Sequence, residues 1–234
     1  MRILTELGSV TVVAIVLLSL ISVSNSQFTS ADSINPGVFA LDSKPYGSTY
    51  SQWAANWWNW ITSIPQENNP VGDETGEKCA VGQKGPVFFL PGTSGGKLER
   101  SCIVPAGKAL FLVILDAECS KTEFPNLKTE EEFLKCAKDL NEGATLAATV
   151  DGVKLKDLEK YRVESPMFNM TFPSNNIFGQ KAGPTVAKSD GWYVILEPLS
   201  PGLHDISFSG SVLGNPVTGT ESYTTDVRYN LTVK

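Results

Sequence analysis

Histidine is almost absent from this sequence, and its scarcity limits the metal and catalytic chemistry that the chain can support. There is one histidine, His204, among 234 residues. A metal site built from several histidines of one chain is therefore excluded. The four cysteines include no Cys-x-x-Cys pair, which argues against a structural zinc site. We expect neither a metal nor a cofactor.

Positive charge is also in short supply, and this bears on the partners that the chain can have. Lys and Arg number 19 against 25 Asp and Glu, which gives a formal net charge of −6. An acidic chain is repelled by nucleic acid and by anionic membrane surfaces. We therefore expect no nucleic-acid partner, and we consider carbohydrate or another envelope protein instead.

The N-terminus has the composition of a secretory signal. A start containing Arg2 is followed by the apolar run Val10–Val23, and Ser24 and Ser26 stand at the −3 and −1 positions before Gln27. This pattern predicts a signal peptide at residues 1–26. The alternative is an uncleaved anchor on a membrane-held accessory subunit, but a bilayer span needs about 20 apolar residues. The predicted location is secreted or at the cell surface, with membrane contact only if this segment is retained.

Residues 27–45 are polar and rich in small side chains, and they include Asn35-Pro36-Gly37. We interpret them as a flexible leader. Residues 46–234 then have a suitable length for one domain with a full core.

An even number of cysteines in an exported chain indicates disulfides. Four cysteines allow three pairings. We favour Cys79–Cys102 with Cys119–Cys136, because each bridge closes a short loop. Asn169 and Asn230 each begin an Asn-x-Thr sequon, so both are candidate glycosylation sites if they are exposed.

The most unusual stretch holds four of the five tryptophans and predicts an amphipathic helix before Pro65. At about 100° per residue, one stripe collects most of the large apolar side chains; these are Tyr50, Trp53, Trp57, Trp60, Ile61 and Ile64. Ser48 is the expected N-cap. Trp58 lies at the edge of this stripe, so it is our candidate for a stacking site for a sugar or another flat ligand. Trp58→Ala is then expected to impair binding with little loss of stability.

After this helix the pattern is mainly that of β-strands. Ala109–Leu115 is apolar throughout, as expected for a strand covered on both faces, and the tryptophan helix is the obvious cover for one of them. A capping box at Thr129–Glu132 opens a short helix within an insert at about residues 119–142. The last strand alternates cleanly, with Val227, Tyr229, Leu231 and Val233 on one face. We predict an antiparallel, jelly-roll-like β-sandwich.

Four segments resemble a family of uncharacterised exported microbial proteins. They are the Trp-x-x-x-Trp-Trp-x-Trp helix, Gly85–Leu90 (GPVFFL), Cys102–Phe111 (CIVPAGKALF) and Ser200–His204. The resemblance covers most of residues 46–234. It implies a secreted single domain and supports pairing Cys79 with Cys102, while the Cys119–Cys136 insert is less typical of it. It implies no activity, so it transfers no catalytic residue.

Two loop motifs match catalytic patterns only formally. Gly92–Gly96 fits the Gly-x-Ser-x-Gly elbow around Ser94, and Asp116 and His204 follow in the chain order of a hydrolase triad. That elbow needs a strand followed by a helix, whereas Lys97–Val104 predicts another strand. The same loop lacks the residues of a phosphate-binding loop. We interpret His204 as a surface histidine beside Asp205.

Paired carboxylates are the remaining enzymatic hypothesis. Asp73 lies in the acidic loop after the tryptophan helix, and Asp116 and Glu118 follow the apolar strand. An acid and a base facing each other near Trp58 would suit glycoside hydrolysis, and oxygen ligands around Asp73 would suit Ca²⁺. Acids in loops are usually only solvated, however. The sequence therefore favours an exported, disulfide-stapled binding or envelope-associated module over a secreted carbohydrate-active hydrolase.

Overall fold

The computed structural model describes residues 35, 37–214 and 220–234, which all belong to one compact unit, Asp32–Lys234. The predicted signal peptide and the first part of the predicted leader lie outside the described residues. Within those ranges, none of the helices combines the length and the apolar character that a bilayer crossing requires.

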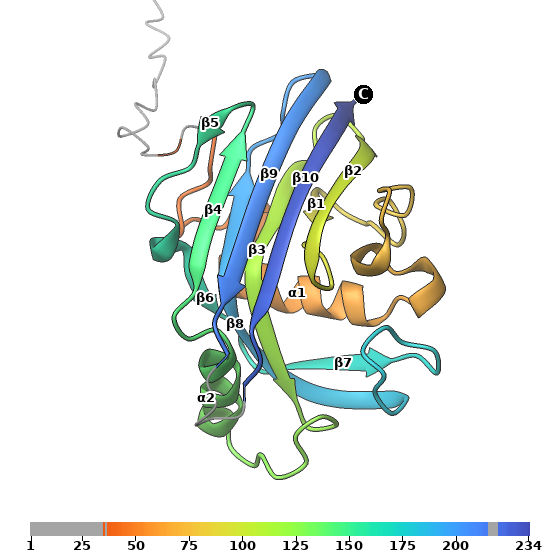
Figure 1. Cartoon of the computed structure of the whole chain (residues 1–234), viewed down its shortest axis with the longest axis vertical. Helices are drawn as coiled ribbons and strands as arrows, with labels where there is room; N and C mark the ends of the chain where they lie inside the picture. The colour runs from red at the N-terminus through yellow and green to blue at the C-terminus, as the bar shows by residue number, and fades with distance from the viewer. Residues whose placement is uncertain (1–34, 36, 215–219) are drawn as a thin grey trace, which may run out of the picture. The chain divides into compact units, whose positions relative to one another are not determined.

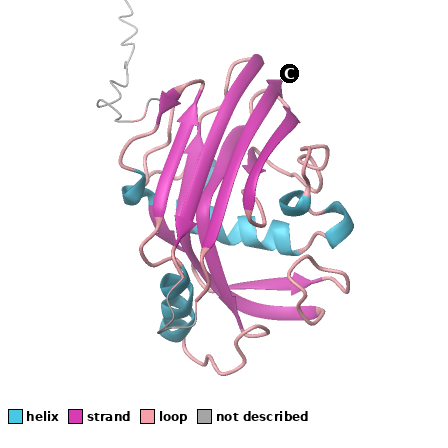
Figure 2. Ribbon diagram, viewed as in Figure 1, coloured by secondary structure: helices cyan, strands magenta, loops and turns pink. Residues whose placement is uncertain are grey.

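The strands of the described residues form two five-stranded sheets (Figures 1 and 2). The first has the order β1-β3-β8-β6, with β7 also paired to β8; the bounds are β1 Val87–Leu90, β3 Ala109–Ser120, β6 Arg162–Glu164, β7 Phe168–Phe172 and β8 Gly183–Leu196. The second has the order β2-β10-β9-β4-β5; the bounds are β2 Gly96–Val104, β4 Thr145–Val150, β5 Val153–Lys154, β9 Gly202–Val212 and β10 Tyr223–Val233. The mainly β, sandwich-like prediction is confirmed. Two pairs, β1 with β3 and β2 with β10, run parallel within otherwise antiparallel sheets.

Strand β3 is apolar on both faces because each face meets a different layer. Leu110, Leu112 and Ile114 enter the core between the two sheets. Phe111 and Val113 enter a second core against helix α1, Tyr50–Thr62, which lies across the outer face of the first sheet (Figure 1). The sequence-based assignment of this helix as the cover for the strand therefore holds.

The N-cap of helix α1 lies one residue later than predicted. Thr49, not Ser48, is the N-cap. Its side-chain hydroxyl accepts from the backbone N–H of Gln52, and the side-chain oxygen of Gln52 accepts from the backbone N–H of Thr49. This reciprocal pair satisfies two backbone donors at the helix start, which a lone serine would not do. The tryptophans are anchored as well as buried, since the indole N–H groups of Trp53 and Trp60 donate to backbone oxygens of Pro45 and Val81, both at 3.0 Å.

The described part of the predicted leader is packed rather than free. Val38 bridges to Leu196 at the end of β8, and the Phe39 amide donates to the Ile195 oxygen at 2.9 Å. Asn35 is buried and donates to the Lys156 oxygen at 2.8 Å. The folded unit thus begins before Tyr46, because the apolar residues Val38 and Phe39 pair with the end of β8.

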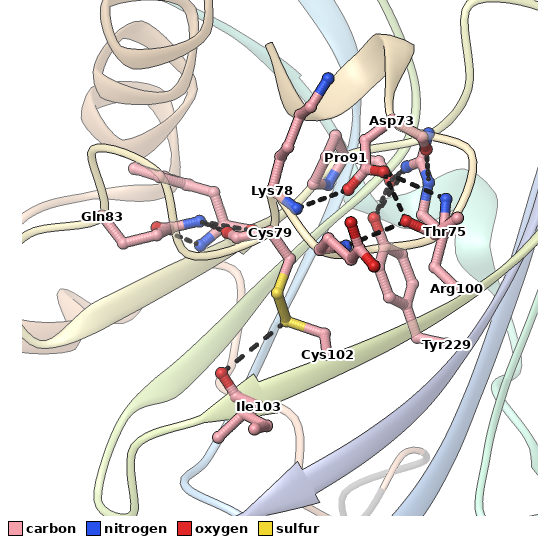
Figure 3. Close-up of a disulfide and its surroundings, with 12 residues drawn as sticks. Asp73, Thr75, Lys78, Cys79, Gln83, Pro91, Arg100, Cys102, Ile103 and Tyr229 are labelled. Atoms are coloured by element: carbon pink, nitrogen blue, oxygen red, sulfur yellow. Dashed lines mark hydrogen bonds between the residues drawn. A yellow bond between two sulfur atoms is a disulfide. The ribbon is translucent and has the colours of Figure 1, made fainter. Parts of the chain in front are cut away.

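The two predicted disulfides are present. Cys79–Cys102 fastens the loop after α1 to β2 (Figure 3), and Cys119–Cys136 fastens helix α2, Glu130–Leu140, to β3. The predicted capping box at Thr129 and Glu132 opens α2. Four short 3-10 helices complete the described elements, at Pro45–Gly47, Gln66–Asn68, Pro70–Gly72 and Leu158–Tyr161.

Candidate functional site

A cavity of about 260 Å³ lies where α1, β3 and the start of β10 meet. The loops after β1 and β7 complete its walls. Its lining is mostly apolar or aromatic, with a few polar groups; the lining residues are Trp57, Trp58, Ile61, Val71, Gly92, Thr93, Ser94, Val113, Leu115, Asp116, Ile177, Phe178, Tyr223 and Thr225. Small-molecule sites typically have this composition.

The carboxyl group of Asp116 is the acidic group of this cavity. Its Oδ2 accepts the indole N–H of Trp57 at 2.8 Å and the hydroxyl of Tyr193 at 3.1 Å. Burial raises the pKa of Asp116 to about 7, although the two donors favour the charged form. The carboxyl group therefore exchanges its proton near neutral pH.

A β-bulge determines that Asp116 faces the cavity. The register between β3 and β8 shifts between Val113 and Leu115. Before the shift the odd-numbered residues face α1; after it Leu115 turns to the core between the sheets and Asp116 turns towards Trp57. Gly191 lies opposite, and a Cβ there would come within 2.4 Å of the Asp116 Cβ. A bulge re-aims side chains in this way, and glycine leaves room for it.

Aromatic rings form much of the wall beside Asp116. The Trp58 ring lies 6.3 Å from both the Trp57 and the Phe178 rings, at steep angles to each. Trp58 therefore lines the cavity, but it is only 8% exposed and belongs to the same core as its neighbours. The expectation that the core does not account for Trp58 is wrong, because the segment carrying Phe178 folds over it. Its indole N–H has no hydrogen-bond acceptor within the described residues. Its role in binding stays a prediction.

The other two candidate acids do not join Asp116 in the lining. Glu118 is buried further along β3, and its pKa is raised to about 10 by burial and by the nearby Glu123. Asp73 folds its own loop, since it accepts from the backbone amides of Thr75 at 3.0 Å and Lys78 at 2.7 Å (Figure 3). Burial opposes ionisation there, but these donors together lower the pKa of Asp73.

The formal hydrolase triad is not assembled. Ser94 and Asp116 both line the cavity, but His204 lies on β9, with its Nδ1 2.7 Å from Asp151 Oδ2 and its Nε2 2.9 Å from the Ser200 oxygen. The loop that carries Ser94 leads directly into strand β2 and not into a helix, which confirms the predicted strand and excludes a catalytic elbow; because β1 and β2 belong to different sheets, the loop is a crossover and not a hairpin. The partner of His204 is Asp151, across the sheet, in place of the neighbouring Asp205.

Arg100 supports the cavity walls, and the sequence reasoning did not single it out. It is 1% exposed, and its guanidinium donates to the backbone oxygens of Val71 at 2.8 Å, Asp73 at 2.6 Å and Gly92 at 2.9 Å, and to the Tyr229 hydroxyl at 2.9 Å (Figure 3). Val71 and Gly92 both line the cavity. The signal was available in the alternation of β2, where Arg100 shares the inward face with Cys102 and Val104.

The remaining candidate sites have simpler surroundings. Both sequon asparagines are exposed, Asn169 on β7 and Asn230 on β10, where the Asn230 amide donates to Glu99 at 2.7 Å. Within the described ranges, no group of three or more His, Cys, Asp or Glu side chains is placed to hold a metal, in the Asp73 loop or elsewhere.

Comparison with known proteins identifies no family. No family model matches the chain, and no curated protein matches it. A chain from a solved structure described as “Structure of PbICP-C in complex with falcipain-2” matches with 14% identity over 64% of this chain and 100% of that chain. Its TM-score is 0.25, which is too low to bear on fold or function.

Proposed function

We propose that the protein is an exported, disulfide-stapled binding module that holds a small, largely apolar ligand in the cavity beside Asp116. The observation that carries this proposal is one half-buried carboxyl group in a cavity of about 260 Å³ with aromatic walls. A few polar groups in an apolar pocket fix the orientation of a ligand, while the walls supply most of the affinity.

Two features support export. The disulfides Cys79–Cys102 and Cys119–Cys136 are typical of proteins that mature in an oxidising compartment. The composition of residues 1–26 is that of a signal peptide. Surface attachment through an uncleaved N-terminus is the alternative, and the intact mass of the native protein distinguishes the two.

The hydrolase alternative receives less support from the positions of the acids. Glycoside hydrolysis needs two carboxyl groups on opposite sides of the scissile bond, roughly 5–10 Å apart. Asp116 lines the cavity, whereas Asp73 is engaged with backbone amides and Glu118 is buried beyond the lining. A binding role requires only the groups that the cavity has.

The test is a titration with benzyl alcohol, whose ring and single hydroxyl match a cavity of this size, followed by tryptophan fluorescence. Wild type is expected to bind saturably. Val113→Phe, which puts a ring into the cavity, is expected to lose binding while unfolding cooperatively in denaturant. The matched control is Ile103→Phe, which adds the same ring to an exposed position on β2 and should bind like wild type. Equal binding by all three proteins would refute the cavity as the site.

A further inference from the structure

The charge around the cavity is of one sign. None of the residues that line it in the described chain is a lysine, arginine or histidine, and Asp116 is the acid among them. The nearby Asp190 carboxylate adds negative potential at Asp116, whereas Glu118, with its pKa raised to about 10, is protonated at neutral pH and adds none. Arg162 offsets the charge of Asp190 by a contact at 2.8 Å, but it faces Asp190 and not the cavity lining. An anionic ligand would meet repulsion without a compensating cation.

The aromatic walls of the cavity favour a positively charged ligand. Trp57, Trp58, Phe178 and Tyr223 all contribute to the lining. The faces of aromatic rings attract cations, and tryptophan does so most strongly, especially where water is excluded. The ring pairs around Trp58 meet at 62° and 48°, so the rings form a corner and not a parallel stack. A positive group at that corner has aromatic surface on more than one side.

We propose that the ligand is a small organic cation, namely a protonated amine carried on an aromatic or aliphatic group. Its ammonium contacts the Asp116 carboxylate, beside the oxygen that accepts from Trp57, and lies against the aromatic corner at Trp58. The apolar part of the ligand fills the space towards Ile61 and Val71. This inference rests on the proposed function, because it names the ligand class of the same cavity.

Asp116 also makes this binding depend on pH. An ammonium binds the carboxylate form, so binding displaces the proton that Asp116 holds below its pKa of about 7. The other groups around this carboxyl do not titrate there: burial raises the pKa of both Tyr193 and Tyr223 above 10, and that of Glu118 lies near 10. The affinity for an amine is therefore expected to rise between pH 5.5 and pH 8, by up to about thirtyfold.

The experiment compares benzylammonium with benzyl alcohol, which have the same number of heavy atoms and differ in charge. Calorimetric titrations of the full mature chain at pH 8 and pH 5.5 are expected to show benzylammonium binding about tenfold more tightly than benzyl alcohol at pH 8. This preference should be lost at pH 5.5, where Asp116 is mostly protonated. It should disappear in Asp116→Asn and persist in Glu99→Gln, which removes an exposed charge on β2 away from the cavity.

Two results would overturn the inference. If benzyl alcohol binds as tightly as benzylammonium at pH 8, the cavity does not select a cation. If Asp116→Asn keeps the preference, the Asp116 carboxylate does not hold the ammonium. Either result leaves the proposed binding function intact. If neither probe binds wild type at either pH, both the inference and the proposed function fail.

Discussion

Replacing Asp116 by asparagine should stabilise the protein at high pH, and the size of the effect follows from the buried carboxyl group. Asparagine has nearly the same shape and keeps an oxygen that can accept from Trp57 and Tyr193. It removes the charge that forms in a largely desolvated position. The comparison therefore isolates the cost of ionising this group.

The magnitude comes from the difference between the folded and unfolded pKa values. The pKa of Asp116 is about 7 in the folded protein and 3.8 in the reference state. Between these values the folded state keeps a proton that the unfolded chain has released, so stability falls as pH rises from about 4 to about 7. One pKa unit corresponds to about 1.4 kcal/mol, so the full penalty above pH 7 is about 4 kcal/mol.

The assay is denaturant unfolding of wild type and Asp116→Asn at pH 5 and pH 8, with the disulfides intact. The stability advantage of the variant should be about 2–3 kcal/mol larger at pH 8 than at pH 5. Asp42→Asn, the same change at an exposed position, should show no such widening. An advantage that is equal at both pH values, or larger at pH 5, would show that the Asp116 carboxyl is not held neutral by burial.

Two further substitutions test the cavity walls. Trp58→Ala should lower the free energy of unfolding by about 3 kcal/mol, because the ring is buried in the α1 core; a loss below about 1 kcal/mol in denaturant unfolding would contradict this. Arg100→Met should cost about 3–5 kcal/mol and speed amide exchange in the Val71 and Gly92 loops, because buried carbonyls lose their donor. Arg228→Met, which breaks an exposed pair with Asp205, is the control and should change the free energy of unfolding far less than Arg100→Met.

Much of the fold could be predicted from local patterns. Side-chain periodicity indicates which faces of an element are buried. One face is buried in the alternating strand β10 and in the tryptophan helix α1, and both faces are buried in β3. Short loops between cysteines favoured the correct disulfides. The parallel pairing of β2 with β10 has no local signal, since it depends on how distant strands meet.

The candidate site was harder to predict for the same reason. Asp116 was a candidate, but two-residue periodicity carried through Ala109–Leu115 would turn Asp116 away from α1. The bulge opposite Gly191 reverses that orientation, and its position depends on the partner strand β8. Arg100 was overlooked because a charged residue in a strand suggests an outward side chain, whereas here four groups from loops and β10 satisfy its guanidinium.

The parallel ladder between β2 and β10 has a consequence for the order in which the chain can fold. Gly96 through Val104 pair with Thr225 through Val233, so β2 finds this ladder partner only far along the chain. Until β10 is in place, β2 lacks that ladder partner. Non-local pairing of this kind raises contact order and slows folding. The Cys79–Cys102 bridge joins cysteines that are close in sequence, so it can form before β2 and β10 pair and hold the loop after α1 against β2 in the meantime.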